Sequence, residues 1–139
     1  MYEPIRTKSV HTMAVAPGIP HRSREEELDI RLAGQLTALL TVTDELHALT
    51  ECGAERAALA SAADRIAVEV ARLSGHYPLR AEPTDGGDRS RVPALRQRAH
   101  TLAGNALAVA TSRNDAVAVA LAEERLAAHD ASSPDLATA

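Results

Sequence analysis

The residues of this chain best suited to bind a ligand form a short basic run. Arg89, Arg91, Arg96, Arg98 and His100 lead into a predicted helix that begins near residue 93. Guanidinium groups beside the free N–H groups of a helix N-terminus can bind a phosphate or a carboxylate. In a second interpretation these side chains only balance the acidic face of the first predicted helix. The sequence favours the second, because no aromatic residue is nearby to stack a nucleotide ring.

Two short patterns have the spacing of a metal site. Asp44-x-x-His47 and Gln97-x-x-His100 place their members one helical turn apart, as the Glu-x-x-His pairs of di-iron bundles do. The second pair has lost its acid, and a lone Asp/His pair of this spacing is usually a surface hydrogen bond. We therefore expect neither a metal nor another cofactor.

Catalytic motifs are missing from the sequence. Cys52 is the only cysteine, which rules out an intramolecular disulfide and favours a reducing compartment, so we expect a cytoplasmic protein. Its thiol is interpreted as a small buried hydrophobe, with a nucleophile activated by the following helix as the alternative. No serine lies in a Gly-x-Ser-x-Gly context, and no phosphate-binding glycine loop is present. The sequence predicts a protein that is not an enzyme.

The composition selects the class of fold that must position these residues. Alanine makes up 29 of the 139 residues, and phenylalanine and tryptophan are absent, which predicts an all-α protein with a thin core. The net charge of −4 argues against nucleic acid as a partner. The longest apolar run, 116–122, is shorter than the roughly 18 residues that a membrane helix needs. Fourteen arginines against one lysine, with the alanine excess, suggest a bacterial origin.

The first two predicted helices form an antiparallel hairpin. Ser23 and Glu26 make a capping box at the start of a helix over 23–50, which carries a leucine stripe at spacings of three and four. Gly53 is interpreted as the left-handed residue that ends this helix. The next helix spans 54–74 and stops at Gly75. A long loop over 75–92 follows, for which disorder is the favoured interpretation.

The second half of the chain predicts a third and a fourth helix, over 93–111 and 115–130. Pro93 suits the first turn of a helix, and Asn114 or Asp115 can cap the next one, although a single kinked helix remains an alternative. The buried stripe of the fourth helix is assigned to Val117, Leu121 and Ala128. Residues 1–22 are predicted to be an extended or disordered arm, in which Met13 is an alternative start, and 131–139 a frayed tail around the single domain 23–130.

Small residues on the predicted helices indicate close packing. Ala99, Ala103, Ala106 and Ala110 recur at three- and four-residue intervals, which lets two helices approach closely. A core this thin favours a homodimer, with Ile30, Val68 and Val119 as the outward-facing residues buried between subunits. We expect a non-enzymatic interaction or regulatory protein of helical type that acts as a homodimer, with another protein as a further partner. The alternative is a bundle that senses a small anion through the basic start of the third helix, beneath the 75–92 loop.

Overall fold

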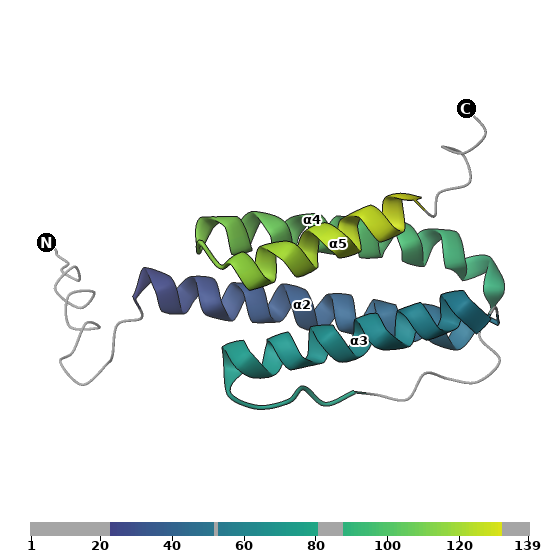
Figure 1. The fold of residues 1–139 in the computed structure, drawn as a ribbon, viewed down its shortest axis with the longest axis horizontal. Coiled ribbons are helices and arrows are strands. Elements are labelled where there is room, and N and C mark those ends of the chain that lie inside the picture. The colour runs from purple at the N-terminus through teal and green to yellow at the C-terminus, as the bar shows by residue number, and fades with distance from the viewer. Residues whose placement is uncertain (1–22, 52, 81–87, 132–139) are drawn as a thin grey trace, which may run out of the picture.

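The computed structural model describes residues 23–51, 53–80 and 88–131, and over these ranges the chain forms an antiparallel bundle of α-helices (Figure 1). They are α2 (Arg24–Leu49), α3 (Gly53–Ser74), α4 (Val92–Ser112) and α5 (Ala116–Ala131), with a 3₁₀ turn, η1 (Arg89–Arg91), before α4. The predicted all-α bundle is confirmed, and each helix end lies within one residue of its expected position. The predicted arm 1–22, Cys52, residues 81–87 of the predicted loop and the segment 132–139 lie outside the described residues.

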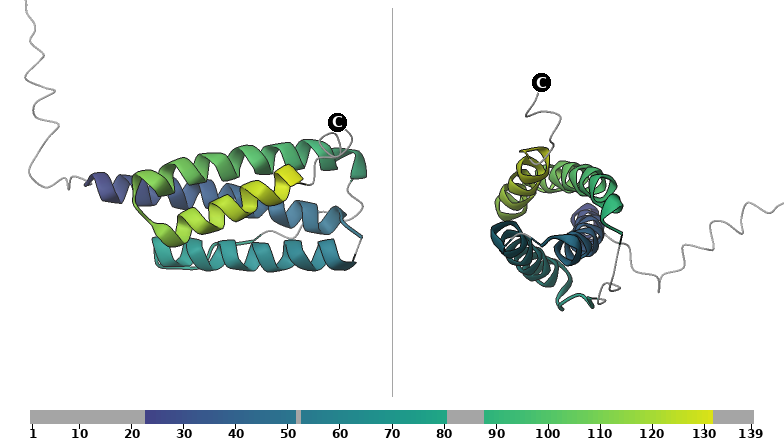
Figure 2. Two further views of the ribbon diagram at one scale, coloured as in Figure 1. Left: turned by 45° about the horizontal axis from the view of Figure 1, so that its top comes forward. Right: turned by 90° about the vertical axis from the view of Figure 1, so that its right-hand side faces the viewer.

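Helix α2 lies at the centre of the packing. It packs along both α3 and α4, and α5 packs along α4, whereas α3 and α5 meet at only a few positions. The end-on view in Figure 2 shows the four helices around a common axis, with α5 beside α4 and α3 beside α2. This arrangement leaves the side of the bundle between α3 and α5 without a packed seam.

The predicted leucine stripe of α2 is the core of the bundle. The capping box at its start is present, since Glu26 N donates to Ser23 Oγ and Ser23 N donates to the Glu26 carboxylate. Every leucine or valine of the expected stripe is buried: Leu28, Leu32, Leu36, Leu39, Val42, Leu46 and Leu49. Helix α2 therefore contributes the large side chains that its neighbours pack against.

Helix α4 meets this core with methyl groups. Ala99, Ala103, Ala106 and Ala110 are completely buried, which confirms that the small residues form a packed face. A face of alanines brings the helix backbones close together, so the contact depends on dispersion between closely spaced atoms more than on long side chains. Any added methylene on this face would have to displace α2 or α5.

The connection between α2 and α3 differs from the expected one. Gly53 is the first residue of α3, and Gly75, with φ +91°, is the only glycine of the described residues in the left-handed region. Thr50 ends α2 instead, through its N–H to the His47 carbonyl and its hydroxyl to the Leu46 carbonyl. The hydrogen bonds of Thr50 therefore satisfy carbonyl groups at the end of α2, a role that the sequence analysis assigned to Gly53.

The junction of α4 and α5 settles the open alternative in favour of two helices. Asn114 has φ +57°, a left-handed conformation that asparagine tolerates, and it turns the chain between them. Asp115 then caps α5, because its Oδ1 accepts from the N–H of Ala118 at 3.1 Å.

The predicted register of α5 is wrong at two of its three positions. Val117 is 61% exposed and Ala128 is half-buried, while Leu121 is buried as expected. The buried positions are Ala118, Leu121, Ala122, Arg125 and His129. These also follow helical spacing, but the stripe is rotated by one residue from the expected one and contains two basic side chains.

Candidate functional site

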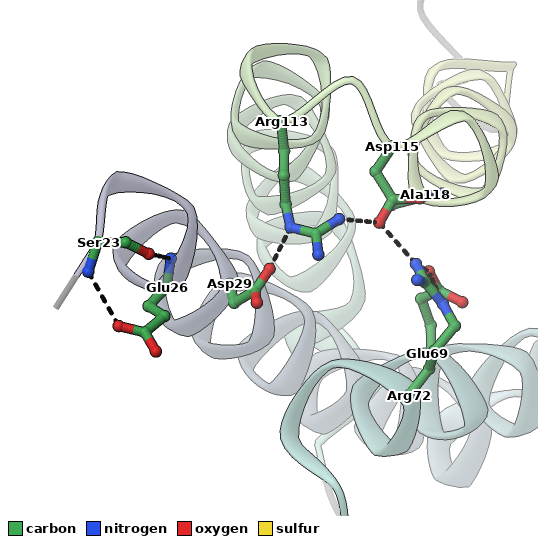
Figure 3. Close-up of polar contacts among 8 residues, drawn as sticks. All are labelled: Ser23, Glu26, Asp29, Glu69, Arg72, Arg113, Asp115 and Ala118. Carbon is green, nitrogen blue, oxygen red and sulfur yellow. Dashed lines mark hydrogen bonds and ion pairs between the residues drawn. The ribbon is translucent and has the colours of Figure 1, made fainter.

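One end of the bundle is held by a group of charged side chains, here called the end cluster. Asp115 Oδ2 accepts hydrogen bonds from Arg72 of α3 at 2.6 Å and from Arg113 at the end of α4 at 2.7 Å (Figure 3). Arg113 also pairs with Asp29 of α2, and Arg72 with Glu69. The cluster thus connects all four helices.

The end cluster has a structural role, because its charged groups satisfy one another. Burial would raise the pKa of Asp115, but hydrogen bonds from Arg72 and from the Ala118 N–H, with the charges of Arg72 and Arg113, hold it below its usual range. Since Asp115 also caps α5 through the N–H of Ala118, these contacts fix the start of α5 to the other three helices.

The basic run predicted from the sequence does not form one site. Arg89 pairs with Glu51 at 3.0 Å and Arg91 with Glu45 at 3.5 Å, both at solvent-exposed positions near the end of α2. Arg98 is exposed on α4. Arg96 points elsewhere, toward Glu55 at the start of α3, with which it forms an ion pair. Surface pairs such as the first two contribute little to stability, roughly 0–1 kcal/mol each.

Arg96 instead borders a small cavity, here called the basic pocket. Its volume is about 160 Å³, and it lies where the end of α2, the start of α3, the first turns of α4 and the end of α5 meet. Its basic lining is Arg96, Arg125 and His129, its acidic lining is Glu55 and Glu124, and its remaining walls are Leu46, Ala58, Leu59 and Ala128. Arg125 and His129 are only 4% and 5% exposed.

Arg125 is incompletely paired. Its Nη1 contacts the carboxylate of Glu124 at 3.1 Å, but its buried Nε has no hydrogen-bond partner within the described parts of the chain. Burial lowers the pKa of the Arg125 guanidinium, an effect that Glu124 opposes and Arg65 reinforces. An arginine nevertheless stays charged at neutral pH, so a positive charge is held inside the bundle.

His129 is also buried without a partner for one ring nitrogen, Nε2. Burial, reinforced by the proximity of Arg125, Arg96 and His100, lowers its pKa to about 4, against the weaker opposing effect of Glu124. The imidazole is therefore neutral at pH 7.

The sequence interpretation missed Arg125 and His129 because it assigned the buried stripe of the last helix to Val117, Leu121 and Ala128. The only signal was spacing, since both continue the stripe Ala118, Leu121 and Ala122 at intervals of three and four residues. That stripe competes with the equally regular one through Val117. The two differ only in helix rotation, which is fixed by contacts to other helices.

A second feature is an apolar groove between α3 and α5, with a volume of about 560 Å³. Val68 of α3 and Val117, Ala120 and Leu121 of α5 line it. Its charged margins are Asp64, Arg65, Glu69 and Glu124. Val68 is 52% exposed, and Arg65 and Glu124 form a half-exposed ion pair across the groove at 3.2 Å.

The partial metal patterns do not assemble into a site. Asp44 binds Arg80 at 2.7 Å, and the described part of the chain contains no group of three histidine, cysteine, aspartate or glutamate side chains arranged for a metal.

None of the described helices combines the length and the apolar character required to cross a membrane. Comparisons with protein-family models, curated proteins and solved structures find no match to this chain.

Proposed function

We propose that this chain is a non-enzymatic helical interaction protein that forms a homodimer through the α3–α5 groove, in a bacterial cytoplasm. The observation that carries the proposal is the groove itself, where α3 and α5 face each other with little contact. Two valines on its opposite sides, Val68 and Val117, are 52% and 61% exposed. Contiguous apolar surface of this kind typically marks an interaction site.

A second copy of the chain suits the groove for two reasons. A two-fold axis along the groove would place α3 of each copy against α5 of the other. The exposed valine of each helix, Val68 on α3 or Val117 on α5, would then cover the apolar side of the facing helix. Arg65 lies on α3 and Glu124 on α5. Their half-exposed pair can therefore form between copies as readily as within one copy, which gives the face charge complementarity with itself.

Val119 contributes less to this surface than the sequence analysis expected, because it is partly buried against the core. Ile30 is 52% exposed on α2, outside the groove lining. Of the three residues expected at a dimer interface, only Val68 borders the groove. Val117, which was assigned to the core, lies opposite it.

The test is the molar mass of the purified protein, by light scattering and sedimentation velocity over a range of micromolar concentrations. The wild type is expected to be a concentration-dependent dimer. Val117→Glu should weaken it at least about tenfold, because half a valine is worth about 1 kcal/mol of burial and an unpaired carboxylate must then be desolvated. Val68→Glu should act in the same way.

Ile30→Glu is the matched control, since Ile30 is as exposed as Val68 but lies on α2 outside the groove. It should leave the dimer intact. A wild type that stays monomeric at high micromolar concentration would overturn the proposal. So would a dimer that Ile30→Glu disrupts as strongly as the groove variants do.

A further inference from the structure

Beyond the end of α3 the chain turns back and lies along the bundle. Gly75, in its left-handed conformation, makes the turn, and residues 75–80, here called the return segment, run back beside α3 (Figure 1). Arg80 anchors the far end of this segment. Its guanidinium binds both carboxylate oxygens of Asp44 on α2, at 2.7 and 3.1 Å, and the carboxylate of Asp64 on α3 at 3.2 Å. The first part of the predicted loop is therefore fixed to two helices.

The return segment presents two large apolar side chains to solvent. Tyr77 is 66% exposed and Leu79 is 99% exposed, whereas Pro78 between them is half-buried. Successive side chains of an extended chain point to opposite sides, so Tyr77 and Leu79 both lie on the outer side. Within one copy of the chain Leu79 buries almost none of its surface. The return segment therefore holds a small apolar patch in a fixed position on the outside of the bundle.

This patch is continuous with the α3–α5 groove. Asp64, which binds Arg80, also lines the groove, and Val68 lies one helical turn further along α3. Arg65, next to Asp64, pairs with Glu124 of α5 at 3.2 Å. The anchored end of the return segment is therefore level with the middle of α5. One surface runs from the groove over the outer side of α3 to the return segment.

The groove by itself offers little apolar surface to a second copy. Val68 and Val117 are each about half exposed, so together they provide the surface of about one apolar side chain. Stable protein interfaces bury roughly 800 Å² on each partner, from about 20–30 residues. The return segment adds a whole leucine and two thirds of a tyrosine. It therefore more than doubles the large apolar surface that the groove alone can contribute to a dimer.

We propose that the return segment is part of the dimer interface and packs through Leu79 and Tyr77 against α5 of the second copy. This inference rests on the homodimer proposed above. A two-fold axis along the groove places α3 of each copy against α5 of the other and keeps every residue at its own level along the axis. Because the return segment lies beside α3, it meets the same helix of the second copy, near the level of Ala120 and Glu124. Arg80 is a positioning residue that holds the segment in place.

The first test is the dissociation constant of the dimer, measured on the full chain by sedimentation velocity. Leu79→Ser should raise it at least about tenfold, since burying a leucine contributes more than a tenfold change in affinity requires. Arg80→Gln should raise it several-fold, because the segment loses its anchor although both apolar side chains remain. Ile30→Ser is the matched control, since Ile30 is exposed on α2 outside the groove lining, and it should leave the dissociation constant unchanged.

The second test observes the return segment directly. The chain has no tryptophan, and Tyr2 and Tyr77 are its only tyrosines, so in a Tyr2→Phe background all tyrosine fluorescence comes from Tyr77. Quenching of this fluorescence by iodide should decrease at least about twofold when the protein concentration is raised from below to above the dissociation constant. Val117→Glu in the same background is the control. It should remain monomeric and be quenched equally at both concentrations.

The inference and the proposed function fail in different ways. A dimer that Val117→Glu disrupts and Leu79→Ser leaves unchanged would overturn the inference while the groove dimer stands. So would quenching of Tyr77 that stays the same when the dimer forms. A wild type that is monomeric at high micromolar concentration would instead remove the proposed function, and the inference with it.

Discussion

The buried imidazole of His129 predicts a specific loss of stability in mild acid. Its pKa is about 4 in the folded protein, compared with about 6.5 for an unburied histidine. Between these values the unfolded chain binds a proton that the folded chain does not, so acid favours unfolding. Relative to its value at pH 7, the free energy of unfolding should therefore decrease through His129 by about 2 kcal/mol at pH 5 and by about 3 kcal/mol at pH 4.

The measurement compares the wild type with His129→Leu by urea unfolding at pH 7, 6, 5 and 4, followed by helical circular dichroism. The difference between the two stabilities isolates His129, because all other titrating groups are common to both proteins. His129→Leu should become more stable relative to the wild type at each step toward pH 4.

His76→Gln is the control, because it removes a histidine at an exposed position just after α3. It should keep the acid sensitivity of the wild type. Parallel stability curves for the wild type and His129→Leu between pH 7 and pH 4 would refute the assignment of His129 to a buried, neutral state. An effect of equal size in His76→Gln would refute it as well.

Three further predictions concern the bundle. Ser23→Ala removes the capping box and should lower the free energy of unfolding by about 1 kcal/mol in urea titrations, with no change expected in the slope. Ala103→Leu should destabilise by about 1–3 kcal/mol, because this side chain is fully buried between closely packed helices, and Ala108→Leu at an exposed position of α4 should not. Asp115→Asn should reduce stability at pH 7 by about 2 kcal/mol through loss of its two arginine pairs. Because the pKa of Asp115 is lowered in the folded state, that difference should shrink as the pH falls below about 4, and a difference independent of pH would contradict the role given to the ion pairs.

Several elements of this fold were readable along the chain because they depend on neighbours in sequence. The capping box of Ser23 and Glu26, the leucine stripe of α2 and the stop at Gly75 all involve residues within a few turns of one another. The alanine face of α4 followed from spacing in the same way. Local signals of this kind are strong where one helical face is clearly more apolar than the others.

The inward face of α5 was not readable in this way. In Ala116–Ala131 alanine and valine occur on every side, so rotating the helix by one residue leaves the apolar pattern almost unchanged. The sequence pattern consequently assigned Val117 to the core and left Arg125 and His129 out of the buried stripe. The rotation depends on contacts with other helices, which include the packing of α5 along α4 and the hydrogen bonds of Asp115 with Arg72 and Arg113.

Composition and periodicity thus established an all-α bundle, its helix ends and its leucine core, because each follows from backbone propensity and from side chains one turn apart. Contacts between helices distant in sequence established the two surfaces of functional interest. The groove is open because α3 and α5 hardly meet, and the basic pocket exists because α5 packs along α4 with Arg125 and His129 turned inward. Neither feature is encoded within a single helix, since each depends on how one helix is rotated and placed against another.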